Sequence, residues 1–292
     1  MSPQNRVQTI RADTVSFLFV PGDRPERFEK AVRSGADVVI VDLEDAVSQT
    51  NKAAARSAVL EEWESLSAIA NETNVTLCIR INALREEVTR HDVALCHLLK
   101  PSLVMVPKVE SRDDLSIIAR EVPDAGVLAL IESATGVLEA RAIATAPNVA
   151  RLVLGSVDLM LNLGVTNDRE PLDASRSMLV LASASAGIGA PVDGVCTSIT
   201  DLDLVKADTE RARSFGFAAK LCIHPKQIAA IAAAFSVSDE EFAWASEVVS
   251  ASKASAGAAT TVNGAMIDLP VLLRALRIVA RRNEAAQAAT SS

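Results

Sequence analysis

The segment at residues 127–159 constrains the fold more than any other part of the sequence. It reads VLALIESATG, then a stretch with helical spacing of apolar residues, then RLVLGSVDL, so that two apolar runs at 127–131 and 152–154 flank a helix. Such a strand–helix–strand unit is almost always right-handed and makes its two strands parallel. Because neighbouring parallel strands end at the same edge, Glu132 and Asp158, which follow the two strands, are expected to lie together there.

Short apolar runs alternate with helical patterns along most of the chain. We expect eight strands, near residues 17–20, 38–43, 76–81, 103–106, 127–131, 152–154, 192–195 and 220–223. These runs are continuously apolar, as expected when both faces of a parallel sheet are buried. Eight such units predict an α/β fold of the (β/α)8 TIM-barrel type. An open doubly wound sheet is the alternative, but no GxGxxG follows the first strand.

The chain is longer than the barrel requires. We place the barrel at residues 1–235 and a C-terminal helical extension at residues 236–292. A chain of 292 residues can bury about three quarters of its unfolded surface, which is enough for one large core. Because the extension follows a completed barrel, we expect it to serve as a lid or as an inter-subunit element.

Within the extension, Ser238 is followed three residues later by Glu241, a capping box that indicates the start of a helix over 236–254. Residues 255–263 are small and polar, which is typical of a flexible connection. A last amphipathic helix is expected over 269–282, followed by a frayed tail.

Composition excludes several classes of protein. The formal net charge of −8 argues against a broad nucleic-acid surface, which needs a basic stripe. The four Cys residues have no CxxC or zinc-ligand spacing, which favours a reducing compartment. The sequence has neither a signal-peptide core nor an uncharged run long enough to span a membrane, so we expect a cytoplasmic protein.

Charged side chains follow the predicted strands, where the active sites of barrels lie. The strand ends carry Glu44, Asp45, Arg80, Lys108, Glu132, Asp158 and His224. Two neighbouring carboxylates repel each other unless a cation lies between them, and Mg²⁺ prefers oxygen ligands. We therefore predict that Glu132 and Asp158 bind Mg²⁺. The alternative is that Glu132 is a helix N-cap and Asp158 a loop cap.

Arg80 ends an apolar strand, where a guanidinium needs a carboxylate or another anion. We expect it to bind the carboxylate of a 2-oxo acid; the alternative is an ion pair with Glu44 or Asp45. Lys108 could form a Schiff base with a carbonyl, but a salt bridge to a nearby carboxylate is favoured. For His224, a hydrogen-bonded structural role is favoured over a catalytic one. The roles of Lys108, Glu44 and His224 stay open.

Motifs along nearly the whole chain resemble the citrate lyase β-subunit group of the HpcH/HpaI aldolase family, which includes malyl-CoA and citramalyl-CoA lyases. The segments are FLFVPGDRPERFEKA from Phe17, VDLEDAV from Val41, RIN from Arg80, VPKVES from Val106, IESATG from Ile131, GSVDL from Gly155, IHPKQI from Ile223 and MIDLP from Met266. The resemblance implies a TIM barrel, a Mg²⁺ ion held by Glu132 and Asp158, and a CoA thioester as partner.

The resemblance also implies roles for residues outside the metal pair. Arg80 matches the residue that holds the carboxylate of the oxo acid, and Asp268 matches a catalytic Asp contributed by a neighbouring protomer. Lys30, and with it Arg24, falls where basic groups meet the CoA moiety. Asp268 could equally be the N-cap of the last helix, and the two roles are compatible.

The function that follows is Mg²⁺-dependent carbon–carbon lyase activity on a 3-hydroxy-acyl-CoA such as citryl-CoA, with a 2-oxo acid such as oxaloacetate and acetyl-CoA as products. One alternative is a 2-oxo-acid aldolase that uses aldehydes. Another is a subunit of a multi-subunit citrate lyase that acts only on a thioester bound to an acyl carrier protein. We expect a homotrimer or homohexamer. Oxaloacetate, pyruvate and glyoxylate differ beyond the atoms that the metal and Arg80 would hold, so the sequence does not choose between them.

Overall fold

The structure is a computed structural model of the whole chain and describes residues 10–11, 13–254 and 260–290. Its contacts divide the chain into two compact units, Met1–Phe235 and Ser236–Ser292. Each unit is described by itself below. None of the helices in the described part of the chain has an apolar stretch long enough to cross a membrane.

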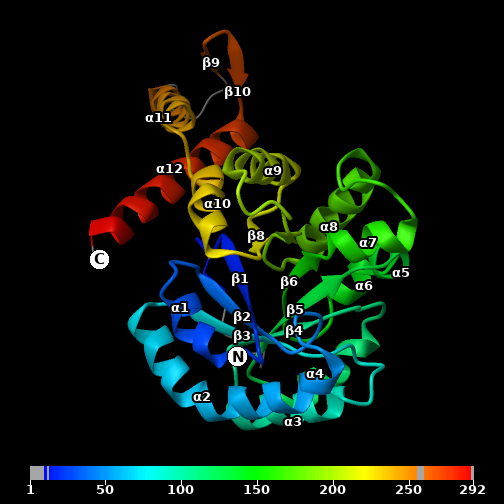
Figure 1. Cartoon of the computed structure of the whole chain (residues 1–292). Helices are drawn as coiled ribbons and strands as arrows, with labels where there is room; N and C mark the ends of the chain where they lie inside the picture. The colour runs from blue at the N-terminus through cyan, green and yellow to red at the C-terminus, as the bar shows by residue number, and fades with distance from the viewer. Residues whose placement is uncertain (1–9, 12, 255–259, 291–292) are drawn as a thin grey trace. The chain divides into compact units, whose positions relative to one another are not determined.

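The first unit contains a closed barrel of eight parallel strands, in which each strand pairs with the next along the chain and β8 pairs with β1 (Figure 1). The strands are β1 (Ser16–Pro21), β2 (Val38–Asp42), β3 (Thr76–Arg80), β4 (Leu103–Val106), β5 (Gly126–Ile131), β6 (Val149–Leu154), β7 (Val192–Asp193) and β8 (Ala219–Cys222). The predicted (β/α)8 TIM barrel is therefore confirmed, and the open doubly wound alternative is excluded.

Helices connect the strands and surround the barrel (Figure 1). They are α1 (Phe28–Val32), α2 (Lys52–Glu72), α3 (Thr89–Leu99), α4 (Ser116–Glu121), α5 (Ala134–Leu138), α6 (Ala140–Ala144), α7 (Ser156–Leu163), α8 (Asp173–Ala186), α9 (Leu202–Phe215) and α10 (Ile228–Phe235). The single helix that we predicted between the fifth and sixth strands is two short helices, because the backbone of Glu139 leaves the helical conformation between them.

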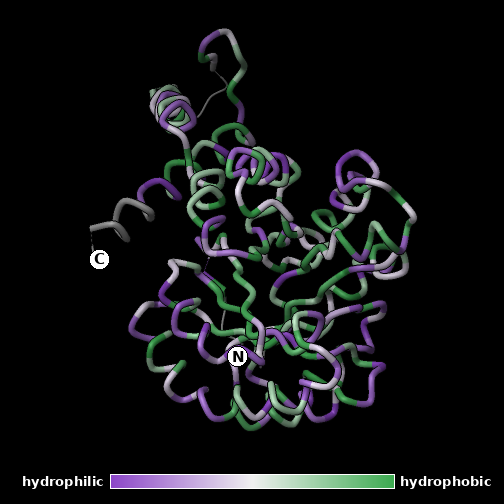
Figure 2. Tube along the Cα trace, in the orientation of Figure 1, coloured by the Kyte–Doolittle hydropathy of each residue, from purple (hydrophilic) through white to green (hydrophobic). Residues whose placement is uncertain are grey.

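Alternate residues of the strands face different apolar clusters. In β2, Val38 and Ile40 belong to a cluster inside the barrel, whereas Val39 and Val41 belong to the larger cluster between the barrel and its helices. Both clusters are buried, which explains why the strand sequences are largely apolar. Figure 2 shows the barrel strands as mostly hydrophobic, while the helices around them carry hydrophilic and hydrophobic segments in turn.

The second unit consists of α11 (Asp239–Ala254), a hairpin of β9 (Thr260–Val262) and β10 (Ala265–Ile267), and α12 (Leu269–Thr290). The predicted capping box is confirmed, because the N–H of Ser238 donates to Glu241 Oε2 and the N–H of Glu241 donates to Ser238 Oγ, both at 3.1 Å. A small apolar core that includes Val248, Ile267 and Ala275 holds the unit together.

Two predictions for this unit were wrong in part. The connection that we expected to be flexible forms strand β9 from Thr260 onward, and its residues 255–259 lie outside the described part. The last helix does not end at residue 282 but continues to Thr290. The added turns are rich in Ala, the residue with the highest helix propensity.

Candidate active site

Strand alternation brings three charged side chains to the inside of the barrel at the C-terminal ends of its strands. Asp42 continues the inward series of β2, Arg80 continues that of β3 after Cys78, and Glu132 continues that of β5 after Leu130. Asp42 and Arg80 are also direct neighbours in the β2–β3 register. Arg80 is 8% exposed and Glu132 5%, so these charges interact with little screening by water.

Carboxylates hold the guanidinium of Arg80 in place. Its Nε and Nη2 donate to the two carboxylate oxygens of Asp42, each at 2.6 Å. Its Nη1 lies 3.0 Å from Glu44 Oε2, an ion pair without hydrogen-bond alignment, and 3.7 Å from Asp45. The guanidinium also lies 4.7 Å from the centre of the Phe19 ring. Burial alone would lower the pKa of Arg80, but the surrounding carboxylates raise this pKa by more than burial lowers it. The net effect is a raised pKa, so the residue stays charged.

The ion-pair alternative for Arg80 is therefore realised with Glu44 and Asp45, and its bidentate partner is Asp42, which we did not predict as a site residue. The signal was present in the sequence: Asp42 is the one polar residue in an otherwise apolar strand, two positions after an inward-facing Ile40. A strand residue two positions on from an inward-facing one faces inward as well.

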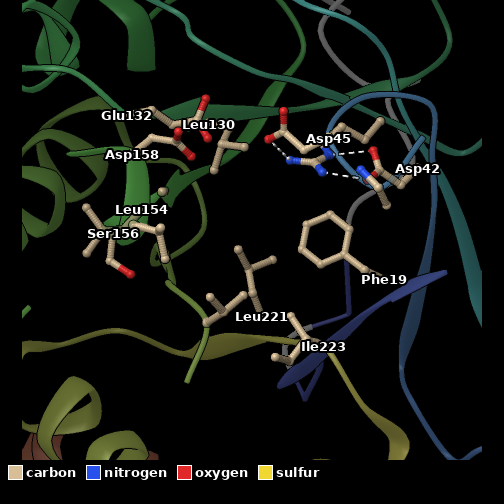
Figure 3. A pocket seen from close by; sticks show the side chains of 15 residues that line it. Phe19, Asp42, Asp45, Leu130, Glu132, Leu154, Ser156, Asp158, Leu221 and Ile223 are labelled. Carbon is tan, nitrogen blue, oxygen red and sulfur yellow. Dashed lines mark hydrogen bonds and ion pairs between the residues drawn. The ribbon is translucent and has the colours of Figure 1, made fainter. Parts of the chain in front are cut away.

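Glu132 and Asp158 come together as their strands predicted. Glu132 directly follows β5, Asp158 lies in the first turn of α7 after β6, and β5 and β6 are paired and parallel. Figure 3 shows their carboxyl groups next to each other at one wall of the pocket. Burial, together with the charges of Glu44 and Asp158, raises the pKa of Glu132 to about 8. The charge of Arg80 lowers this pKa, but by less than burial and the two acids raise it.

Glu132 is not a helix cap. The N-cap of α5 is Ser133, whose Oγ accepts the N–H of Gly136, so the capping alternative for Glu132 is wrong. Glu132 Oε2 instead accepts the backbone N–H of Lys108 at 2.9 Å. Gly155 packs directly against Glu132, because a Cβ at position 155 would lie 2.8 Å from Glu132 Oε1 and closer still to its Cγ.

Lys108 makes the predicted salt bridge. Its Nζ donates to Glu44 Oε1 at 2.9 Å. Partial burial lowers the pKa of Lys108, but the Glu44 carboxylate and the other nearby acids raise it by more. Because Schiff-base formation needs a neutral amine, this environment argues against that chemistry for Lys108.

A pocket of about 310 Å³ separates the two charged groups of side chains. Figure 3 shows Glu132 and Asp158 on one wall and Asp42 and Asp45 on the opposite wall. Apolar side chains form much of the remaining lining: Phe19, Leu130, Leu154, Val195, Leu221 and Ile223. The size and the few converging polar groups suit a small polar molecule.

The other predicted residues do not line this pocket. His224 caps a 3₁₀ turn, and its Nδ1 accepts a backbone N–H, which is the structural role that we favoured. Arg24 and Lys30 are exposed, before and within α1. Asp268 lies in the second unit as the N-cap of α12, where its Oδ1 accepts the N–H of Val271 at 3.2 Å.

The donor set fits a hard divalent cation. Glu132 and Asp158 present adjacent carboxylates beside an open pocket, and the raised pKa of Glu132 reflects negative charge that the nearby cations only partly offset. Within the described ranges, no group of three or more His, Cys, Asp or Glu side chains forms a closed metal site. Two protein carboxylates with the remaining positions left to water or substrate oxygens is the arrangement typical of Mg²⁺.

The fold and the pocket define a (β/α)8-barrel enzyme that combines paired carboxylates with a buried, oriented arginine at the C-terminal ends of its strands. The chain belongs to the HpcH/HpaI aldolase/citrate lyase family, whose model matches residues 15–225, and it is accordingly a carbon–carbon lyase. The family predicted from the motifs is thus confirmed.

Individual relatives match over four fifths of the chain or more. A citrate lyase subunit beta-like protein of Mycobacterium tuberculosis is 35% identical over 282 residues, which cover 94% of this chain and 98% of the relative. A (3S)-malyl-CoA thioesterase of Cereibacter sphaeroides is 33% identical, covering 81% and 82%. The crystal structure of M. tuberculosis CitE with magnesium, acetoacetate and coenzyme A aligns with a TM-score of 0.80 at 33% identity, covering 92% of this chain and 98% of that one.

Proposed function

We propose that the protein is a Mg²⁺-dependent lyase that cleaves, or forms, a 3-hydroxy-acyl-CoA such as citryl-CoA, with a 2-oxo acid such as oxaloacetate and acetyl-CoA as products. The observation that carries this proposal is the placement of Glu132 and Asp158 across one pocket from the wall that holds Asp42 and Asp45, with Arg80 in the same lining. The complex of M. tuberculosis CitE with magnesium, acetoacetate and coenzyme A supports it.

Glu132 and Asp158 would hold the metal ion. When bound, Mg²⁺ supplies a positive charge that stabilises the oxygen that becomes the keto group. Arg80 would bind the carboxylate of the oxo acid. Nε and Nη2 already donate to Asp42, so the remaining guanidinium N–H groups would donate hydrogen bonds to the substrate. Asp42 would fix the orientation of the guanidinium.

Cleavage needs one acid and one base. The substrate hydroxyl gives its proton to a water molecule in the open pocket and becomes the keto oxygen, the carbon–carbon bond breaks, and its electron pair passes to the thioester enolate. Asp268 would then donate a proton to the enolate carbon, or remove that proton in the direction of synthesis. We place Asp268 in the site of a neighbouring copy within a homotrimer or homohexamer, and Lys30 and Arg24 against the CoA moiety.

The test is turnover by the isolated chain. Citryl-CoA and malyl-CoA are each incubated with the protein and Mg²⁺, and the 2-oxo acid and the acetyl thioester are quantified together. The proposal expects both products in equal amounts, with loss of turnover after removal of Mg²⁺. The conservative variants Glu132→Gln and Asp158→Asn are expected to be inactive but folded.

Three results would contradict the proposal. Free CoA without any 2-oxo acid would identify a thioesterase, the activity named for the C. sphaeroides relative. Condensation of pyruvate or oxaloacetate with aldehydes but not with acetyl-CoA would identify a free aldolase. Activity that appears only when the acyl group is presented on an acyl carrier protein would identify a subunit of a larger lyase.

A further inference from the structure

Lys108 contacts two acidic residues of the site through two different groups. Its backbone N–H donates to Glu132 Oε2, and its ammonium donates to Glu44 Oε1, each at 2.9 Å. The carboxyl groups of Glu44 and Glu132 therefore lie within the reach of one lysine. Only one of the two, Glu132, lines the pocket.

The backbone of Lys108 is in the left-handed region, with φ of 53°. This conformation turns the N–H of Lys108 toward Glu132, while the next N–H, that of Val109, donates to the carbonyl of Leu130. Glycine adopts this region without the steric cost that a Cβ brings. A lysine at this position accepts that cost and adds an ammonium group beside the acids of the site.

Glu44 is the neighbour on which that ammonium acts. Glu44 is 2% exposed, and its two oxygens face the two cations, Oε1 toward Lys108 Nζ and Oε2 toward Arg80 Nη1. Without Lys108, Oε1 would be a buried carboxylate oxygen without a cation, separated by the span of one lysine from Glu132, which we assign to the metal. Such an oxygen is a strong candidate ligand for a hard cation.

We propose that Lys108 is a positioning residue that keeps Glu44 out of the coordination sphere of the metal while it orients Glu132 toward Asp158. This inference rests on the proposed function. The ion then has two protein carboxylates, and its remaining positions stay available to the substrate oxygens. A third carboxylate would bind the cation more tightly and would compete with the 2-oxo acid for it.

The test is a pair of titrations on the Lys108→Met variant. In the first, Mg²⁺ and then Ca²⁺ are titrated into the metal-free protein and the heat is measured; in the second, pyruvate is titrated at saturating Mg²⁺. We expect the affinity for Mg²⁺ to rise about 5-fold, with a larger rise for Ca²⁺, which takes more oxygen ligands. The affinity for pyruvate should fall about 10-fold. A purely structural role would instead weaken the binding of both.

Three further variants separate the parts of the proposal. Lys108→Gly removes the ammonium but keeps the left-handed backbone, and should behave as Lys108→Met does. Lys108→Arg keeps the charge, and should restore values close to those of the unmodified protein. Adding Glu44→Gln to Lys108→Met removes the third carboxylate, and should return the affinity for Mg²⁺ to its original value.

Lys100 offers a matched control. It is also a lysine with positive φ, 50°, but it lies at the C-terminus of α3, outside the pocket. Lys100→Met should leave both titrations unchanged. Unchanged or weaker Mg²⁺ binding in folded Lys108→Met and Lys108→Gly would overturn the proposal, as would failure of Glu44→Gln to reverse the effect. If the unmodified protein binds no Mg²⁺, the proposed function fails first.

Discussion

Two clusters of buried charges in the barrel unit differ in how completely they are paired. The first lies on the outer side of the barrel wall, where Lys220 Nζ contacts Asp193 Oδ2 at 2.6 Å and Asp208 Oδ2 at 2.7 Å. Arg176 Nε donates to the other oxygen of Asp193 at 3.2 Å. A third carboxylate, that of the partly exposed Asp168, lies 3.7 Å from Arg176 Nη2. The two fully buried cations thus give each of the buried carboxylates, Asp193 and Asp208, a partner between the strands β7 and β8 and the helices α8 and α9.

The second cluster lies at the mouth of the barrel and has more acids than bases. Its cations are Arg80 and Lys108, and its carboxylates are Asp42, Glu44, Asp45, Glu132 and Asp158. Burial raises the pKa of both Asp193 and Glu132, but Lys220 and Arg176 more than reverse this for Asp193, whereas Glu132 remains raised, to about 8.

The difference separates a cluster that supports the fold from one that is prepared for a ligand. A buried carboxylate whose charge is fully compensated gains nothing from a further cation. One that keeps a raised pKa beside a pocket marks a place where a cation, and then a substrate, can complete the site. Each prediction below changes one cluster and asks whether the other responds.

The largest effect is expected at the mouth. Replacing Glu132 and Asp158 together by Gln and Asn removes both charged ligands of the metal. Because loss of an outer-shell partner alone costs about 10–100-fold in metal affinity, Mg²⁺ binding should fall by more than about 100-fold. The free energy of unfolding of the metal-free protein should not fall, since the repulsion between the two carboxylates is removed. Calorimetric titration and urea unfolding measure the two quantities, and unchanged Mg²⁺ affinity would contradict the assignment.

The wall cluster should show the opposite pattern. Lys220→Met leaves Asp193 and Asp208 without their shared cation, and breaking a buried ion pair in this way typically costs about 3–5 kcal/mol. We therefore expect a large loss in the free energy of unfolding measured in urea, with Mg²⁺ affinity at the mouth nearly unchanged under conditions where the protein is folded. A loss of metal affinity as large as that of the mouth variants would show that the clusters are coupled.

A smaller effect is expected from Gly155→Ala. The added Cβ would overlap the side chain of Glu132, which must then leave its present position beside Asp158. Mg²⁺ affinity should fall about 10-fold, equivalent to about 1.4 kcal/mol. The double variant Gly155→Ala with Glu132→Asp shortens the side chain that meets the new methyl group. In the Glu132→Asp background, Gly155→Ala should therefore lower Mg²⁺ affinity by less than it does in the unmodified protein. An equal loss in both backgrounds would show that the methyl group does not act through Glu132.

The residues at the mouth were largely predictable because they depend on local patterns. Continuous apolar runs locate the strands, and the topology of parallel strands then collects the residues that follow them, including Glu132 and Asp158, at one end of the barrel. The contact of Asp42 with Arg80 could not be predicted from such patterns alone, because it depends on the register between β2 and β3. The packing of Gly155 against Glu132 likewise depends on side-chain positions that no spacing along the sequence specifies.

The wall cluster was not predictable in this way. Arg176 and Asp208 lie on helices, Asp193 and Lys220 on strands, and their meeting depends on how α8 and α9 rotate and pack on the barrel. The hairpin of the second unit is a different case, because its signal was present: Asn263-Gly264, both with positive φ, is a dipeptide typical of a two-residue turn. The small polar residues before it favoured a flexible connection instead.

The smallest effect concerns the pH dependence of the wall cluster. The pKa of Asp193 is lowered in the folded state, so its contribution to stability is present above its unfolded pKa, about 3.9, and is lost as pH falls through the folded value. The pKa of Lys220 is raised, so its contribution is present below its unfolded pKa, about 10.4, and is lost only above that. The stability difference between the unmodified protein and Asp193→Asn should therefore stay constant between about pH 5 and pH 9 and shrink below about pH 4.

An exposed ion pair provides the control for this series. Glu29 and Arg33 form a pair one turn apart on the surface around α1, at 2.8 Å, and such pairs contribute about 0.3–0.5 kcal/mol. Glu29→Gln should change the free energy of unfolding by no more than this at any pH, and 1 M salt should remove the effect, because exposed charges are screened and buried ones much less. Suppose instead that Asp193→Asn lowered the free energy of unfolding as little as Glu29→Gln does, and that salt removed the effect. Water would then reach the wall cluster, and the pairing of Asp193 with buried cations could not explain why its pKa is lowered while that of Glu132 is raised.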